Sequence, residues 1–221
     1  MDTQTANNLS IALWLFPKGL NLHNIHSSDE EFLSELSSCK YDEYSYTRRC
    51  AKYALGSLFQ TNPLNIPLDS RPGRKPTLRD GWGYLSLSHC EDAIVVGWSS
   101  YAIGVDIERK DRKFLYKKIC KRFFTQAENI QFDNTETRKQ REFVLKTWIM
   151  KEAAFKCQEN PSMGDFFNWE KDNDLDICSN QRASKSQSFF LINYQYWSVG
   201  IASSFLKWNQ KPIICICEKL T

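Results

Sequence analysis

The sequence predicts an α+β protein made of two similar α/β halves, residues 1–100 and 101–221. The order strand–helix–helix–hairpin occurs twice along the chain, and the two copies join near residues 99–102. The 221 residues are 42% hydrophobic, so each half of about 100 residues has enough apolar content to close a core. We therefore expect two similar α+β halves of about 100 residues each.

The first half is expected to begin with a buried strand over Leu9–Phe16, which is rich in bulky residues. A capping serine ahead of acidic residues in Ser27–Glu31 predicts the start of a helix. A second helix is expected over Glu43–Phe59. Four prolines make Thr61–Pro76 a loop.

Two apolar runs, Tyr84–His89 and Ala93–Trp98, flank a short polar turn and predict the first hairpin. The second half repeats this order. It has a strand at Ile103–Glu108, helical patterns over Phe114–Phe123 and Glu142–Gln158, and a polar, irregular stretch over Asn160–Ser188. Strand-like segments follow at Phe189–Tyr194, Trp197–Ser204 and Ile213–Cys217.

Composition excludes several classes of protein. The 29 basic and 26 acidic residues leave a net charge of only +3, which does not call for a nucleic-acid partner. The eight cysteines contain no CxxC pair, which argues against a zinc site. Several of them stand in apolar stretches, so reduced thiols are expected rather than disulfides. The run Ile11–Phe16 stops at Pro17 after six residues, whereas a membrane span needs about 20. We expect a cytoplasmic protein without a membrane segment.

Chemistry first appears in the strand that contains Asp106 and Glu108. Side chains alternate across a strand, so both carboxylates share one face, about 7 Å apart, with Val105 and Ile107 on the other. Such a pair can grip a hard cation, and magnesium prefers oxygen ligands of this kind. Taken alone, the pattern favours the alternative interpretation, an edge strand with a solvated polar face.

A helix later in the chain places an indole, a carboxylate and an ammonium in line. Trp148, Glu152 and Lys156 are four residues apart and therefore lie on one helical face. The alternative interpretation is a solvated Glu152–Lys156 pair beside a packed tryptophan, which would contribute only about 0.2–0.5 kcal/mol.

Three further segments could meet an anionic ligand. Lys75 and Pro76 stand in an extended turn that holds the ammonium outward. Ser88 and His89 end a strand. Arg48 and Lys52 lie four apart on a helix. A basic turn, a structural histidine and a solvated helix face are the respective alternatives.

Together these segments resemble the Sfp-type 4′-phosphopantetheinyl transferases. The resemblance runs from about residue 44 to 156, and its last three segments are the most specific. The segments are Gly73–Pro76, Leu85–Cys90, Gly104–Glu108, Lys121–Glu128 and Trp148–Lys156. The sequence departs from the family pattern at Arg74, Ser86, Cys90 and Glu159–Gly164.

The resemblance implies a pseudo-dimeric fold with the site between the halves. It also implies that Mg²⁺ (or Mn²⁺) is held by Asp106, Glu108 and Glu152, and that Glu152 and Lys156 are catalytic. The residues implied to contact coenzyme A are Arg48, Lys52, Lys75, Pro76, Ser88, His89 and Lys156. Glu128 is a further candidate base.

The implied reaction moves the phosphopantetheine arm of coenzyme A onto a serine of an apo carrier protein and releases adenosine 3′,5′-bisphosphate. The carrier would be an acyl, polyketide or peptidyl carrier, and duplication would let a monomer suffice. A basic docking surface is expected at Arg109, Lys110, Lys117 and Lys118. The alternatives are a metal-dependent phosphodiesterase using the same acids, and a module that binds coenzyme A or nucleic acid without reaction, with Trp82 and Trp98 stacking bases.

Overall fold

The computed structural model describes residues 11–20, 22, 37–172, 177–180, 182–205 and 213–217. The chain divides into two compact units, the first made of residues 1–101 and 212–221 and the second of residues 102–211. Both units combine antiparallel strand pairs with helices. The predicted α+β class is confirmed.

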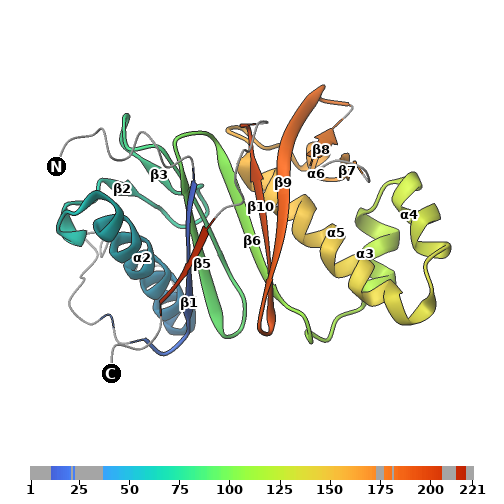
Figure 1. Ribbon diagram of the computed structural model, residues 1–221, viewed down its shortest axis with the longest axis horizontal. Helices are drawn as coiled ribbons and strands as arrows, with labels where there is room; N and C mark the ends of the chain where they lie inside the picture. The colour runs from blue at the N-terminus through green and yellow to red at the C-terminus, as the bar shows by residue number, and fades with distance from the viewer. Residues whose placement is uncertain are drawn as a thin grey trace. The chain divides into compact units, whose positions relative to one another are not determined.

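The first unit is built on a four-stranded sheet in the order β11-β1-β5-β4, and α2 lies against one face of it (Figure 1). β1 pairs antiparallel with β5 and parallel with β11, and β5 pairs antiparallel with β4. The elements are β1 (Ile11–Pro17), α2 (Ser38–Phe59), the 3₁₀ turn η2 (Pro63–Asn65), β2 (Leu68–Asp69), β3 (Thr77–Leu78), β4 (Tyr84–His89), β5 (Ala93–Ser99) and β11 (Ile213–Ile216).

The core of this unit follows from the apolar pattern. Every residue of β5 is buried, as expected of a central strand. α2 presents small residues to the sheet, among them Cys50 and Ala54, which are fully buried. The helix ends at Phe59, and the residue that caps it, Gln60, takes a left-handed conformation with a φ of 50°.

The second unit is built on a five-stranded antiparallel sheet in the order β6-β10-β9-β8-β7, and α5 packs along β6 and β10 (Figure 1). The elements are β6 (Ile103–Arg109), α3 (Tyr116–Phe123), α4 (Gln126–Asp133), α5 (Thr137–Cys157), α6 (Met163–Phe166), β7 (Trp169–Lys171), β8 (Ile177–Asn180), β9 (Lys185–Tyr194) and β10 (Trp197–Ser203).

The two units repeat one topology. In the first, β1 leads through α2 to the β4–β5 hairpin, and β1 pairs antiparallel with the second hairpin strand. In the second, β6 leads through α5 to the β9–β10 hairpin and pairs antiparallel with β10. The predicted internal repeat therefore has a counterpart in the strand order of each unit.

Two glycines bring α5 unusually close to its sheet. A Cβ at Gly104 of β6 would lie 1.9 Å from the carbonyl oxygen of Ala153 and 2.4 Å from the nitrogen of Cys157. A Cβ at Gly200 of β10 would lie 2.4 Å from Cγ2 of Ile149. Backbone thus meets backbone where β6 passes under the last turns of α5.

Three expectations need correction. Residues 160–188 are not uniformly irregular, because α6, β7, β8 and the start of β9 fall within them. α4 was not expected as a separate helix. β11 pairs with β1 and so belongs to the first unit, whereas a division at residue 100 assigned it to the second half. The helix start expected at Ser27–Glu31 lies outside the described residues.

Within the described part of the chain, no helix is both long and apolar enough to cross a membrane. The cysteines whose side chains the structure describes are free thiols, namely Cys50, Cys90, Cys120, Cys157, Cys178, Cys215 and Cys217.

Candidate active site

The two acids of β6 lie on the face of the strand that meets α5. Gly104, Asp106 and Glu108 alternate with Val105 and Ile107, and Gly104 contacts the α5 backbone directly. Asp106 is buried, and its Oδ1 accepts a hydrogen bond of 2.8 Å from Nζ of Lys156. The strand alternation expected from the sequence therefore places the first acid under the helix.

α5 contributes Glu152 and Lys156 to the same cluster. The Nζ of Lys156 lies 2.8 Å from Oδ1 of Asp106 and 3.9 Å from Oε2 of Glu152. One ammonium thus bridges an acid of the strand and an acid of the helix. The alternative of an isolated, solvated i,i+4 pair does not account for this contact with β6.

Glu108 has a partner that the sequence did not reveal. It forms an ion pair with Arg112, which follows β6 in the chain. Arg141 of α5 in turn donates hydrogen bonds to the carbonyl oxygens of Lys110 and Arg112 and so fixes this turn. The sequence offered one signal for this pair, the spacing of four residues between Glu108 and Arg112. That spacing predicts a contact on a helix but not across a turn, where these two residues stand.

The three carboxyl groups share one electrostatic environment. Burial raises the pKa of Glu108 to about 7, with Asp106 and Glu152 adding to the rise and Arg112 and Lys156 opposing it. Burial also raises the pKa of Glu152, where Lys156 opposes and Asp106 adds to the shift. The carboxylates are thus close enough to repel one another, and an added cation would relieve that repulsion.

The donor chemistry of this cluster suits a hard divalent cation, because it consists of carboxylate oxygens. As the side chains stand, however, no group of three His, Cys, Asp or Glu residues among those described is arranged to hold a metal ion. Lys156 and Arg112 engage the carboxylates instead. A metal at Asp106, Glu108 and Glu152 would therefore require these side chains to turn away from their present partners.

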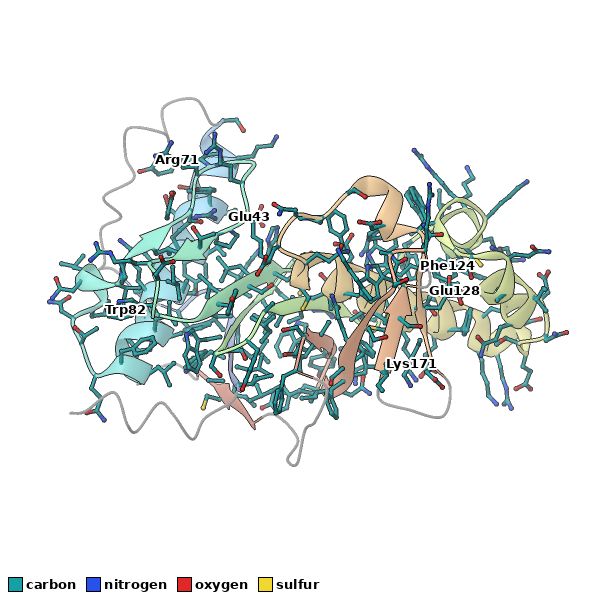
Figure 2. The ribbon with its side chains drawn as sticks, turned by 90° about the horizontal axis from the view of Figure 1, so that it is seen from above. Glu43, Arg71, Trp82, Phe124, Glu128 and Lys171 are labelled. Carbon is teal, nitrogen blue, oxygen red and sulfur yellow. The ribbon has the colours of Figure 1, made fainter. Side chains whose placement is uncertain are left out.

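The first unit holds the remaining expected residues. His89, at the end of β4, has its Nε2 3.3 Å from Oε1 of Glu43 on α2, and Nζ of Lys18 lies 3.3 Å from the same oxygen (Glu43 is labelled in Figure 2). Ser88 is buried on β4, next to His89 in the chain. The expected phosphate-binding histidine is thus held by a carboxylate, a partner that the sequence did not indicate.

The basic residues of this unit occupy two further places. Arg48 and Lys52 lie on α2, and the guanidinium carbon of Arg48 stands 3.2 Å from the centre of the Tyr44 ring. Lys52 is buried rather than solvated. Lys75 and Pro76 are half-buried in the loop before β3, after Gly73 with its φ of 75°.

Glu128 does not join the cluster around Lys156. It closes the capping box of α4, and its Oε2 lies 2.9 Å from the nitrogen of Thr125 and 2.8 Å from Nζ of Lys151 (Glu128 is labelled beside Phe124 in Figure 2). Lys151 also donates to the carbonyl oxygens of Phe167 and Trp169. Glu128 therefore has a structural role, and the sequence spacing Thr125-x-x-Glu128 was the signal for its cap.

The fold and this cluster define an α+β protein with acidic side chains of a strand and a helix bridged by a lysine. A family model for the 4′-phosphopantetheinyl transferase superfamily matches residues 102–216. The match spans more than half of the chain, from the residue before β6 to the end of β11. The chain belongs to the 4′-phosphopantetheinyl transferase superfamily. No curated protein matches it.

Proposed function

We propose that the protein transfers the 4′-phosphopantetheine group of coenzyme A to a serine of an apo carrier protein and releases adenosine 3′,5′-bisphosphate. The observation that supports this most directly is the bridge from Lys156 to Asp106 and Glu152. It lies within the segment that the superfamily model matches. The ammonium of Lys156 stays 28% exposed, so a diphosphate that reaches it can compete with the two carboxylates for it.

Two residues of α5, Glu152 and Lys156, have separate roles in the proposed reaction. Glu152 accepts the proton of the attacking serine, directly or through a water, as the serine oxygen forms its bond to the phosphorus that bears the pantetheine arm. The bond from that phosphorus to the bridging oxygen breaks. Lys156 then neutralises the phosphate that departs with adenosine 3′,5′-bisphosphate.

Asp106, Glu108 and Glu152 would hold Mg²⁺ or Mn²⁺. When bound, the ion supplies charge neutralisation on the diphosphate of coenzyme A. The carboxylate donors and their mutual repulsion favour such an ion. Arg112 would then release Glu108.

The basic residues of the first unit are proposed to contact coenzyme A. Arg48, Lys52 and Lys75 of the first unit and Lys156 of the second are proposed to provide cations for its phosphates, and Ser88, His89 and Pro76 of the first unit complete the set. Glu43 holds His89 in the structure, so a phosphate would compete with that carboxylate for the imidazole.

The decisive experiment incubates the purified protein with Mg²⁺, coenzyme A and an apo carrier protein. Transfer adds one phosphopantetheine, about 340 Da, to the carrier in a mass spectrum. Acyl, polyketide and peptidyl carriers are tested in parallel. Hydrolysis of a phosphodiester without any mass gain would favour a phosphodiesterase, and binding without reaction would favour a binding module.

We expect Asp106→Ala to lower the rate of transfer by at least about a hundredfold, because it removes the strand's partner for Lys156 and one proposed metal ligand. The matched control is Asp133→Ala, an exposed acid at the end of α4 in the same unit. Circular dichroism checks that both variants fold. Near wild-type turnover by Asp106→Ala would show that the cluster is not the site of the reaction.

A further inference from the structure

Five aromatic side chains from three elements of the second unit form a continuous cluster, which we call the aromatic patch. It consists of Phe123 at the end of α3, Trp148 and Phe155 on α5, Phe166 in α6, and Phe167 directly after it. The ring centres of Phe166 lie 6.1 Å from Phe123, 5.5 Å from Trp148, 5.6 Å from Phe155 and 5.9 Å from Phe167. Phe123 and Phe167 also stack face to face at 5.9 Å.

The patch is only partly covered. Phe166, at its centre, is buried, but Phe123, Trp148 and Phe155 are half-buried and Phe167 is 36% exposed. Leaving several large aromatic rings partly exposed to water at one place costs a fold stability that burying them in a core would provide. Exposed apolar surface of this kind marks an interaction site more often than scattered single residues do.

The patch continues the face of α5 that carries the reactive residues. Trp148 lies one turn before Glu152, and Phe155 is adjacent to Lys156 in the chain. A macromolecule that presents a serine to Glu152 must therefore approach beside these rings.

The rim of the patch is cationic. α3 carries Lys117, Lys118, Lys121 and Arg122, all exposed. The guanidinium carbon of Arg122 lies 5.1 Å from the centre of the Phe123 ring, so charge and aromatic surface are contiguous. Asp165 of α6 is the acid nearest in sequence to the exposed rings and is half-buried. The excess of positive charge selects an acidic partner.

We propose that the aromatic patch and the basic residues of α3 form the docking surface for the carrier protein, which would offer an apolar side chain flanked by carboxylates near its serine. This inference rests on the proposed function. The proposed surface differs from the one expected from the sequence, which included Arg109. In the structure Arg109 pairs with Asp111 and lies over the Tyr196 ring. Lys117 and Lys118 remain part of the surface.

An apolar centre with a charged rim is the usual anatomy of a specific protein interface. Phe167 is the most exposed ring, and truncating such an anchor typically costs about tenfold or more in affinity. Its side chain can be removed without touching the hydrogen bond from Lys151, since that bond reaches the main-chain carbonyl of Phe167.

The test measures steady-state transfer with wild-type protein, Phe167→Ala and the double variant Lys121→Glu/Arg122→Glu. We expect the KM for the apo carrier to rise about tenfold in each, with kcat and the KM for coenzyme A within about twofold of wild type. The charge-reversed variant should also lose the salt dependence of the carrier KM. The matched controls are Ile130→Ala, an exposed apolar residue of α4, and Lys171→Glu, an exposed cation of β7.

The outcomes separate the two proposals. Wild-type transfer with an unchanged carrier KM in Phe167→Ala and in the double variant would overturn the docking surface and leave the proposed function intact. No transfer by the wild type to any carrier would reject the proposed function, and the docking surface with it. Binding of labelled apo carrier, followed by fluorescence anisotropy, supplies a readout without turnover. Weaker binding of the labelled carrier by Phe167→Ala and by the double variant supports the docking surface. If the wild type binds single-stranded DNA tightly instead of the carrier, and both variants weaken that binding, the docking surface is overturned.

Discussion

Two lysines of α5, Lys151 and Lys156, lie five residues apart but have different surroundings. Lys151 is wholly buried and reaches Glu128 and two main-chain carbonyls, whereas Lys156 faces Asp106 and stays 28% exposed. Burial lowers the pKa of Lys151 and raises that of Glu128, and their mutual attraction opposes both shifts. Burial thus gives one lysine a structural role and leaves the other able to change partners.

We expect Glu128→Ala to lower the free energy of unfolding by about 3–5 kcal/mol, because it leaves the ammonium of Lys151 buried without its counter-ion. Denaturant unfolding measures the change. The control is Glu142→Ala, which breaks the exposed Glu142–Lys146 pair of α5 and should cost no more than about 0.5 kcal/mol. Equal losses in the two variants would contradict the role assigned to burial.

The residue types of the candidate site could be predicted, but several of their partners could not. Alternation along a strand and the spacing of four along a helix placed Asp106, Glu152 and Lys156 on faces that meet. Two partners escaped prediction: Arg112 pairs with Glu108 across a turn in the second unit, and Glu43 pairs with His89 through tertiary packing in the first. No periodicity specifies such contacts.

At the scale of elements, the contact between β6 and α5 depends on Gly104. The next residue on the same face of β6 is Asp106, and its short side chain reaches Lys156 because the helix lies directly on the strand. A helix held away by a side chain at position 104 would carry Lys156 out of reach. The sequence shows this glycine, but only the structure shows what it approaches.

We expect Gly104→Ala to destabilise the protein by about 1–3 kcal/mol or more, since its methyl group would overlap backbone atoms of Ala153 and Cys157. Among the molecules that remain folded, kcat should fall, because the helix would hold Lys156 away from Asp106. The control is Gly164→Ala in α6, where the nearest atom to a new Cβ is the Ser162 hydroxyl at 3.8 Å. A folded Gly104→Ala protein with normal kcat would refute the positioning role.

Elements were predicted best where their pattern was long. α2, the β4–β5 hairpin and α5 lie where periodicity placed them, with ends shifted by a few residues. α4, α6 and β7 are short, and the polar sequence around them resembles a loop. Their positions follow from packing, as when Trp169 of β7 becomes fully buried beside α5.

At the scale of the whole molecule, the repeat of strand, helix and hairpin is the feature that the sequence anticipated. The return of the chain to its starting sheet is the feature that it missed. β11 pairs in parallel with β1, from Ala12 with Ile213 to Leu15 with Ile216. A local pattern cannot specify a partner about 200 residues away, because both candidate sheets offer an edge to an apolar strand.

We expect a stop codon at Ile213 to weaken the first unit selectively. Its sheet would lose the strand that covers the outer edge of β1, while the sheet of the second unit keeps all its strands. Limited proteolysis should then cleave residues 37–101 faster than residues 102–205. Unchanged protection of the first unit would indicate that β11 contributes little to its stability.

The pairing of β11 with β1 also bears on biosynthesis. A ribosome makes β1 before the second unit and β11 after it, so this edge of β1 stays unpaired with β11 while the entire second unit is synthesised. An unpaired edge invites other strands. A chaperone that binds the nascent chain would therefore have to cover this edge until β11 has been synthesised.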